Sequence, residues 1–290
     1  MQAATQRRIE RALDSRIVRL VAVAGGDINQ AWRADLDDDR RVFIKTNANA
    51  PRGMFYTEAL GLGWLAEPSA LRVPAVVAAS DAAAAGLDAF LVLEWIESSA
   101  PTRTFDATLG RGLGELHREG AARFGLQYDN FIGSLSQSNR PHDTWVAFYW
   151  CERIEPQLRT AIDRGRLDQS MARKSEILGT RLQALMGPEE PPARLHGDLW
   201  SGNLMVGPAG EPCLIDPAVY GGHREMDLGM MLLFGGFSES TIAAYREVYP
   251  LAPGAEERRG LMQLYPLLVH VNLFGGSYSA RASDIVKAYI

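Results

Sequence analysis

The sequence HGDLWSGN at residues 196–203 brings together groups that could do chemistry. It places Asp198 five positions before Asn203, and a β-hairpin with the turn GPAG at residues 207–210 is predicted directly after it. Because antiparallel strands bring their ends together, Asn203 at the entrance of the hairpin and Asp216 at its exit are expected to converge. An amide oxygen and a carboxylate suit Mg²⁺ bound to a nucleotide. Asp198, on the preceding loop, can accept a proton from an attacking hydroxyl group.

A stretch of this type has a second interpretation. Asp198 and Asn203 could simply cap helices at either end of a loop. The hairpin and Asp216 that follow favour the chemical interpretation. We expect His196 to hold the loop by hydrogen bonds rather than to transfer protons. We also expect Asp227 to anchor this loop in a buried network, with Arg224 nearby.

Lys45 is the second candidate. The chain has three lysines, and this one stands in an apolar segment, RVFIKT at residues 41–46. By itself it could extend along the surface to solvent. Glu58 lies 13 positions further on, in a predicted helix, within reach as an ion-pair partner. The turn at Gly25-Gly26 can cover phosphates with backbone N–H groups, although two glycines are weak evidence alone.

Trp200 and residues 128–139 allow two interpretations each. Trp200 is either a wall for a bound substrate or a core residue that anchors its loop, and its place on the loop favours the first. Residues 128–139 (YDNFIGSLSQSN) are an ordered loop that either lines the acceptor site or merely connects. Residues 270–278 could approach that site from late helices, but nothing else supports this. We expect His117 near a helix C-terminus, where a cation is favourable.

The elements that must position these residues follow from the hydrophobic pattern. The first 97 residues predict a five-stranded antiparallel sheet with one inserted helix, preceded by an amphipathic helix. The predicted helices are residues 5–17 and 54–66, and the predicted strands are residues 20–24, 31–36, 41–46, 76–80 and 90–96.

The pattern changes after residue 97. Ser98, Ser99 and Pro101 mark a linker, and the rest of the chain is mostly helical. The exception is the hairpin, with strands predicted at residues 204–206 and 213–215. We therefore expect two lobes, residues 1–97 and 98–290.

Composition excludes several classes of protein. The chain has 290 residues, of which 30 are Lys or Arg and 35 are Asp or Glu, giving a net charge of −5 and disfavouring nucleic-acid binding. Two cysteines exclude a disulfide scaffold. No segment has the apolar length of a membrane span or a signal peptide. We expect a cytoplasmic protein.

The order of these elements resembles that of protein kinases: a Gly-rich turn, a strand lysine, a helix glutamate, HxDxxxxN and a later aspartate. The loop reads HGD rather than HRD, and the later motif reads IDP rather than DFG. With these two motifs, the sequence resembles the aminoglycoside and choline kinase group. LHGDLWSGN, IDPAVYGGHREMDLGMM, GGDINQAW and YDNFIGSLSQSN together resemble the fructosamine kinase (ketosamine-3-kinase) family over essentially the whole chain.

This resemblance implies an α+β, bilobal protein-kinase-like fold and the phosphorylation of the 3-hydroxyl of a ketosamine by ATP and Mg²⁺. Asp198 would be the catalytic base, Asn203 and Asp216 would hold the metal, and Lys45 would bind the α- and β-phosphates. Residues 94–97 would form the hinge that meets adenine. The implied nucleotide-binding residues are Gly25, Gly26, Lys45, Glu58, Glu94, Trp95 and Ile96, and Trp200 is the candidate substrate residue.

Two alternatives stay open. The chain could be a kinase of the same fold that acts on choline, an amino alcohol or an aminoglycoside. It could also be a nucleotide-binding regulatory module without turnover, although the intact set of Lys45, Glu58, Asp198, Asn203 and Asp216 argues against this. The partner we expect is a small-molecule or protein-bound ketosamine, with no nucleic acid and no membrane.

Overall fold

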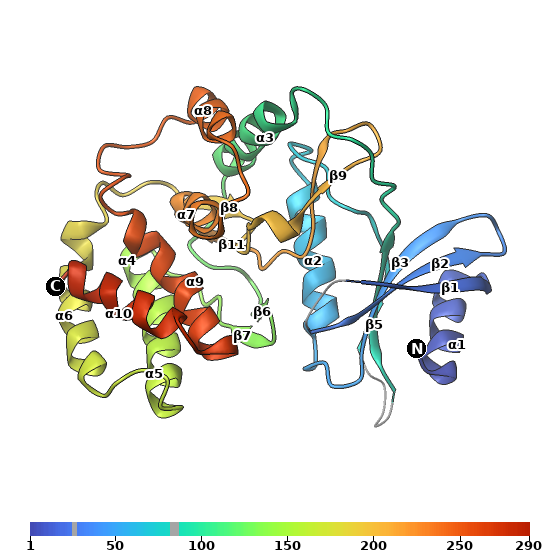
Figure 1. The fold of residues 1–290 in the computed structure, drawn as a ribbon, viewed down its shortest axis with the longest axis horizontal. Coiled ribbons are helices and arrows are strands. Elements are labelled where there is room, and N and C mark those ends of the chain that lie inside the picture. Colours follow the sequence, from blue (N-terminus) through green and yellow to red (C-terminus); the bar gives the residue numbers. More distant parts are fainter. Residues whose placement is uncertain (25–27, 82–86) are drawn as a thin grey trace. The chain divides into compact units, whose positions relative to one another are not determined.

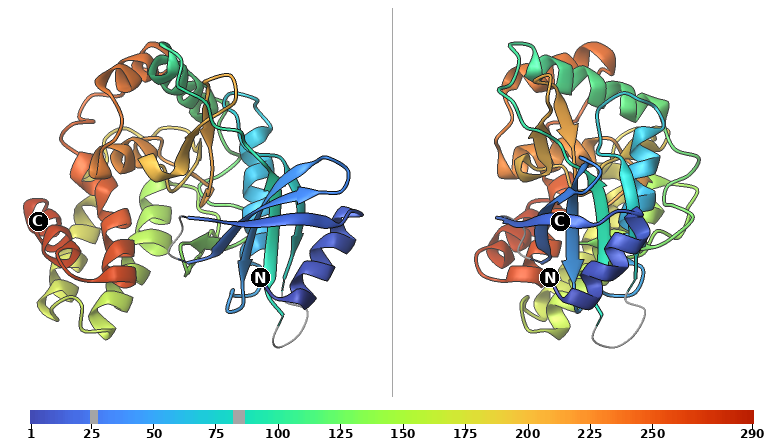
Figure 2. Two further views of the ribbon diagram at one scale, coloured as in Figure 1. Left: turned by 45° about the vertical axis from the view of Figure 1, so that its right-hand side comes forward. Right: turned by 90° about the vertical axis from the view of Figure 1, so that its right-hand side faces the viewer.

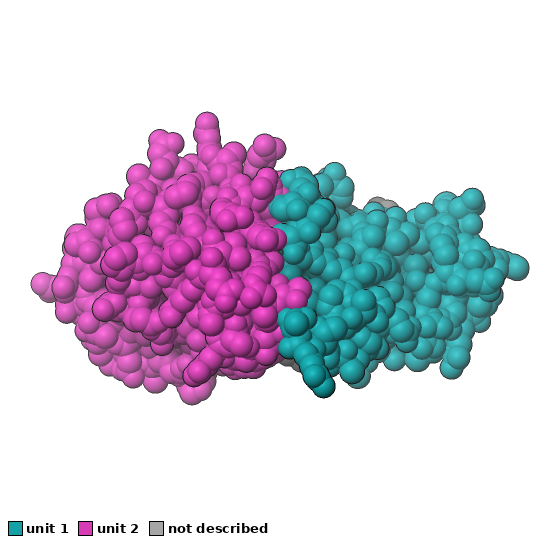
Figure 3. Space-filling model, turned by 90° about the horizontal axis from the view of Figure 1, so that it is seen from above, with its two compact units in different colours: residues 1–105, 204–217 teal, residues 106–203, 218–290 magenta. Residues whose placement is uncertain are grey.

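A computed structural model describes residues 1–24, 28–81 and 87–290. The chain divides into two compact units (Figure 3). The first, which we call the sheet unit, comprises Met1–Phe105 and Leu204–Pro217. The second, the helical unit, comprises Asp106–Asn203 and Ala218–Ile290.

The sheet unit extends past the expected boundary at residue 97 and includes the hairpin that follows Asn203. Two hydrogen bonds tie the linker to this hairpin. Ser99 Oγ donates to the carbonyl oxygen of Gly207 at 2.7 Å, and the Thr102 N–H donates to that of Gly210 at 3.1 Å. The linker is therefore part of the sheet unit.

The predicted five-stranded antiparallel sheet is confirmed (Figure 1). Its strand order is β1-β2-β3-β5-β4, and every neighbouring pair runs antiparallel. The strands are β1 (Ile17–Val23), β2 (Gln30–Leu36), β3 (Arg41–Asn47), β4 (Val76–Ser80) and β5 (Ala89–Glu94), and the helices are α1 (Ala3–Leu13) and α2 (Met54–Ala66).

The two helices cover opposite faces of this sheet (Figure 2). Ile9 of α1 packs in one apolar cluster with Ile44 of β3, whereas Phe55 of α2 packs in another with Phe43. Successive side chains of a strand point to opposite faces, so Lys45 lies on the same face as Phe43. The alternation thus directs Lys45 toward α2.

Several predicted boundaries differ from the structure, among them the start of the first strand, which is Ile17 rather than residue 20. The first helix ends at Leu13 rather than at residue 17, because Asp14 adopts a left-handed conformation (φ 49°) and β1 begins at Ile17. Strand β5 ends at Glu94 rather than at residue 96, so the expected hinge follows the strand instead of lying in it.

The hairpin consists of β9 (Leu204–Val206) and β10 (Pro212–Leu214), so its second strand begins one residue earlier than predicted. The Gly207 N–H donates to the carbonyl oxygen of Glu211 at 2.7 Å, which closes the turn directly before Pro212. The Leu214 N–H donates to the carbonyl oxygen of Arg72 at 2.8 Å. This bond sets the register of the hairpin against the rest of the sheet unit.

The helical unit is built around one large apolar cluster to which α4, α5, α6, α7, α9 and α10 contribute. Residues 128–139, expected to be a loop, contain a short hairpin of β6 (Asn130–Ile132) and β7 (Leu135–Gln137). The other elements of this unit are α3 (Phe105–Glu119), α4 (Trp145–Phe148), the π-helical η1 (Tyr149–Ile154), α5 (Glu155–Asp163), α6 (Ser170–Leu185), β8 (Ala193–Leu195), the 3₁₀ turn η2 (Ser201–Asn203), β11 (Tyr220–Gly222), α7 (Glu225–Phe234), α8 (Glu239–Val248), α9 (Arg259–Phe274) and α10 (Tyr278–Ala288).

Within the described ranges, no helix combines the length and the apolar character that crossing a lipid bilayer requires.

Candidate active site

The ammonium group of Lys45 lies between two carboxylates of the sheet unit. Its Nζ is 2.7 Å from Glu58 Oε1 and 2.5 Å from Asp216 Oδ1. The sequence predicts the ion pair with Glu58, and the structure contains it. The contact with Asp216 was not predicted, because it depends on how the hairpin packs against the sheet.

Lys45 is buried, and its charge state follows from its two partners. Burial by itself would lower the pKa of Lys45, but the charges of Asp216 and Glu58 outweigh burial and raise this pKa. The side chain therefore stays cationic at physiological pH. A fixed ammonium group can bind phosphate as a point charge, and this role remains a prediction.

Asp216 has an unusual backbone conformation. Its φ is 55°, in the left-handed region that residues with a Cβ adopt at a cost of about 1–2 kcal/mol. Such a conformation persists only where the surrounding structure holds it, and it is typical of functional sites. Its side chain keeps 42% of its surface exposed, so one carboxylate both contacts Lys45 and faces solvent.

Asp198 and Asn203 are linked directly in the helical unit. Asn203 Nδ2 donates to the backbone oxygen of Asp198 at 2.8 Å and to its Oδ2 at 3.0 Å. The Asn203 N–H also donates to the carbonyl oxygen of Trp200 at 3.0 Å, which closes the 3₁₀ turn. The amide of Asn203 thus orients the carboxylate expected to accept the proton.

Asp227 anchors the loop that carries Asp198, as predicted. Its Oδ2 accepts the His196 N–H at 2.8 Å, and its Oδ1 accepts the Gly197 N–H at 2.9 Å. Burial by itself would raise the pKa of Asp227, but hydrogen bonds from His117 and Gly197 outweigh it and lower this pKa. The buried carboxylate therefore holds two consecutive backbone groups of the loop.

Arg224 lies near this network, as expected, but it does not contact Asp227 directly. Its guanidinium binds Glu190 at 2.6 and 2.7 Å and also hydrogen-bonds to Tyr245, the partner of His117. His117 lies in the last turn of α3, as expected. It is buried, with its Nε2 3.1 Å from Asp227 Oδ2 and its Nδ1 2.9 Å from Tyr245 Oη.

The structure places Trp200 on the loop with 41% of its surface exposed. A Cβ at Gly202 would overlap the Trp200 indole, so the ring lies across this glycine. This observation explains why a residue without a side chain stands at position 202. That Trp200 contacts a substrate stays a prediction.

The side chains at the expected hinge are occupied within the sheet unit. The Glu94 carboxylate accepts the Ala75 N–H at 3.0 Å and pairs with Arg72. Trp95 Nε1 donates to Glu97 Oε2 at 2.9 Å, and Ile96 is buried. Any contact of Glu94, Trp95 and Ile96 with adenine would involve their backbone, which stays a prediction.

Arg72 is a residue that sequence reasoning missed. Its guanidinium pairs with Glu94 at the end of β5 and lies 3.4 Å from Glu211 Oε1 at the start of β10. Arg72 therefore ties the hinge to the hairpin that carries Asp216. No motif in the sequence marks it.

Two other expected regions contribute little to the described site. Gly25 and Gly26 lie outside the described residues. In residues 270–278, the half-buried His270 packs against the rings of Phe234 and Tyr278, with centroids 4.6 and 5.0 Å away. That this segment lines the acceptor site stays a prediction.

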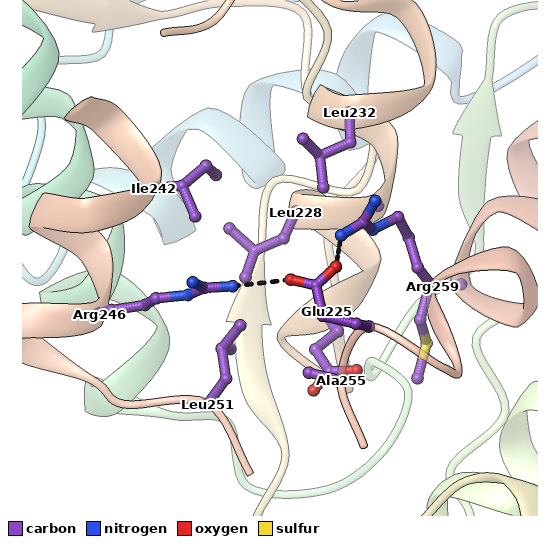
Figure 4. A pocket seen from close by; sticks show the side chains of 11 residues that line it. Glu225, Leu228, Leu232, Ile242, Arg246, Leu251, Ala255 and Arg259 are labelled. Atoms are coloured by element: carbon purple, nitrogen blue, oxygen red, sulfur yellow. Dashed lines mark hydrogen bonds and ion pairs between the residues drawn. The ribbon is translucent and has the colours of Figure 1, made fainter. Parts of the chain in front are cut away.

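A small pocket of the helical unit is separate from these residues (Figure 4). It lies among α7, α8 and α9, and its interior has room for about 30 Å³, roughly one water molecule. Both arginines at its edge, Arg246 and Arg259, pair with Glu256. All three side chains are exposed, so these ion pairs lie at the surface beside the pocket.

The donor chemistry expected of a magnesium site is present. Asp216 has a carboxylate, and Asn203 has an amide whose nitrogen donates to Asp198 and whose oxygen is a donor atom of the type that a metal ion can bind. Hard oxygen donors of this kind suit Mg²⁺, which usually takes only one or two protein ligands beside phosphate oxygens and water. The residues present therefore fit the ion in type.

Comparison with known proteins agrees with this chemistry. The sequence profile described as fructosamine kinase matches residues 1–290. A protein-ribulosamine 3-kinase of Arabidopsis thaliana is 37% identical over 279 residues, covering 95% of this chain and 84% of that protein. A ketoamine kinase homologue of Enterococcus faecium is 34% identical, covering 93% of this chain and 95% of that protein.

Solved structures show the same relationship. A fructosamine-3-kinase homologue from Thermobifida fusca superposes with a TM-score of 0.90 at 37% identity, covering 100% of this chain and 99% of that one. The choline kinase LicA from Streptococcus pneumoniae, with a TM-score of 0.61, 16% identity and coverage of 98% and 96%, shares the fold alone. The chain has a protein-kinase-like fold and belongs to the fructosamine kinase family.

Proposed function

We propose that this protein transfers the γ-phosphoryl group of ATP to the 3-hydroxyl of ketosamines, the adducts that reducing sugars form with amines. The observation that carries the proposal is the buried ammonium of Lys45, held between Glu58 and Asp216 in a chain of the fructosamine kinase family. The acceptor class follows from the relatives, one of which is named as a protein-ribulosamine 3-kinase.

Different residues bind the nucleotide and activate the acceptor hydroxyl. Lys45 binds the α- and β-phosphates, and the backbone of residues 94–97 meets adenine. Asp198 accepts the proton of the 3-hydroxyl as the oxygen forms its bond to the γ-phosphorus and ADP departs. Asn203 and Asp216 hold Mg²⁺, which neutralises phosphate charge when it is bound.

The candidate contact with the acceptor is Trp200. Its exposed indole lies on the same loop as Asp198 and suits packing against the apolar face of a sugar. The carrier amine is a free amino acid or a lysine of a protein, and the test below compares the two.

The test measures phosphate transfer from MgATP to ribulosyl-lysine, fructosyl-lysine and a ribulosylated protein, with choline and kanamycin as controls. We expect transfer to ketosamines only, and a loss of about 10²–10³-fold in kcat for Asp198→Asn. Transfer to choline or kanamycin instead would overturn the acceptor class. Nucleotide binding without transfer to any acceptor would show a regulatory module.

A further inference from the structure

The hairpin β6–β7 carries amide side chains that point into the helical unit rather than to solvent. Asn130 is 4% exposed and Gln137 is 2% exposed. Asn130 Nδ2 donates to the carbonyl oxygen of Val219 at 2.8 Å. Gln137 Nε2 donates to the carbonyl oxygen of Ala218 at 3.1 Å and to Asn130 Oδ1 at 2.8 Å. Two consecutive backbone carbonyls are thus held by two buried amides.

A second layer of donors fixes which way these amides face. Asn139 Nδ2 donates to Asn130 Oδ1 at 2.9 Å, and Tyr265 Oη donates to Gln137 Oε1 at 2.6 Å. Arg153 in turn donates to Asn139 Oδ1 at 2.6 Å. Because the oxygen of each amide already accepts from a neighbour, its NH₂ group must face the backbone. The orientation of Asn130 and Gln137 is therefore determined by the network.

Arg153 is the last donor in this series of hydrogen bonds, and it is fully buried. Its guanidinium lies 4.0 Å from the ring centroid of Tyr220 and 4.5 Å from that of Phe148. A buried cation needs partners, and these rings and the Asn139 amide supply them. This packing makes the network costly to rearrange.

The backbone that the amides hold follows Asp216 in the chain and contacts the loop that carries Asp198. Ala218 and Val219 follow Asp216 by two and three positions. The Ala218 N–H donates to the carbonyl oxygen of His196 at 2.9 Å, and a Cβ at Gly197 would overlap the carbonyl oxygen of Ala218. The segment is therefore fixed on one side by the hairpin and on the other by the loop that carries Asp198.

Asp216 itself requires such fixing. Its left-handed backbone is unfavourable for a residue with a Cβ and needs support from its surroundings. The residues after it supply a rigid attachment, because Pro217 has a fixed φ and both following carbonyls are hydrogen-bonded. Loosening residues 218–219 would let the carboxylate of Asp216 relax.

We propose that Asn130 and Gln137 are positioning residues that clamp the backbone of Ala218 and Val219, and thereby set the carboxylate of Asp216 for the metal and the loop of Asp198 for the acceptor. This inference rests on the proposed function. On this inference, residues 128–139 neither line the acceptor site nor merely connect two elements. Their amides are buried and bonded to the backbone after Asp216, so their role is to support that segment.

The experiment compares Asn130→Leu and Gln137→Met with Asn272→Leu as the matched control. Asn272 is a buried amide of the same unit, 2% exposed, whose Nδ2 donates to Gln157 at 2.7 and 2.9 Å rather than to residues 218–219. Each variant is measured for melting temperature, for kcat and KM, for the Mg²⁺ concentration at half-maximal rate, and for the shift in melting temperature that ADP causes with and without Mg²⁺.

We expect both clamp variants to need about tenfold more Mg²⁺, to lose at least tenfold in kcat and to lose the Mg²⁺-dependent part of the ADP shift, with KM for the ketosamine within about twofold. The control should lower the melting temperature comparably and leave the Mg²⁺ requirement and kcat within about twofold. If Asn130→Leu does not fold, Gln137→Met carries the same comparison, since it keeps the Asn130 bond to Val219.

Equal behaviour of clamp and control variants would overturn the inference. So would a rise in KM for the ketosamine with an unchanged Mg²⁺ requirement, which would place the hairpin at the acceptor. A wild-type protein that phosphorylates no ketosamine would contradict the proposed function instead, and the ADP shift would still report on the clamp.

Discussion

Lys45 Nζ donates to Glu58 Oε1 at 2.7 Å, joining the third strand of the sheet to the helix that covers it. The same ammonium contacts Asp216 at the exit of the β9–β10 hairpin. One buried cation therefore connects strand, helix and hairpin, and each of its partners can be removed separately.

Replacing Glu58 by Gln should weaken nucleotide use. The substitution removes one of the two charges that raise the pKa of Lys45 and hold its Nζ, so the side chain turns toward Asp216. We expect kcat/KM for ATP to fall about 10–100-fold, or about 1.4–2.7 kcal/mol. The control is Glu155→Gln, which removes an exposed i,i+4 pair with Arg159 and should change kcat/KM less than twofold. Equal effects of the two variants would contradict a special role of the pair.

Trp200→Ala separates the two interpretations of this residue. If the exposed indole packs against a sugar, KM for the ketosamine should rise about tenfold or more, while KM for ATP and the melting temperature stay nearly constant. Steady-state kinetics with each substrate varied in turn measures this. A drop of several degrees in melting temperature without a selective rise in KM would show that Trp200 instead anchors its loop.

Asp227→Asn should damage both stability and catalysis. The amide can no longer accept hydrogen bonds at both positions that now receive the N–H groups of His196 and Gly197, and it removes the charge facing His117. We expect the free energy of unfolding to fall by about 2–4 kcal/mol and kcat to fall at least tenfold. Urea unfolding and kinetics at a temperature where the variant stays folded test the two effects. An unchanged kcat in the folded variant would show that the loop keeps its geometry without this anchor.

His223 should make the protein sensitive to mild acid. Its burial, with a smaller contribution from Arg258 and Arg224 against the opposing charge of Glu190, lowers the pKa of His223 from 6.5 to about 4. The unfolded chain therefore binds a proton at this residue that the folded chain does not bind between these two pH values. The free energy of unfolding falls as pH falls through this window, by about 2 kcal/mol at pH 5.

The measurement is urea unfolding of the wild type and of His223→Gln between pH 7.5 and pH 5. The variant should be less stable at pH 7.5 and should lose the part of the pH dependence that His223 contributes. Parallel pH profiles for the two proteins would assign the acid sensitivity to other groups.

Features of this protein that have a local cause could be predicted from the sequence. Short apolar runs rich in β-branched and aromatic residues identified the five strands, and helical spacing identified α2 at its observed bounds, Met54–Ala66. The spacing from Lys45 to Glu58 placed the two residues within reach of each other, and the family resemblance implied the ion pair that the structure contains. The sequence motifs indicated the family.

Contacts between segments far apart in the chain depend on how the folded elements pack, and they could not be predicted. Residues 128–139 and 217–219 are about 80–90 positions apart, and no pattern within either shows that Asn130 meets Val219. The position of His117 near the end of a helix could be predicted, but its partners Asp227 and Tyr245 could not, because they lie more than 100 positions away. Periodicity reports which face of an element is buried. It does not report which buried polar group will satisfy which hydrogen bond, because that depends on how the packed elements bring their side chains together.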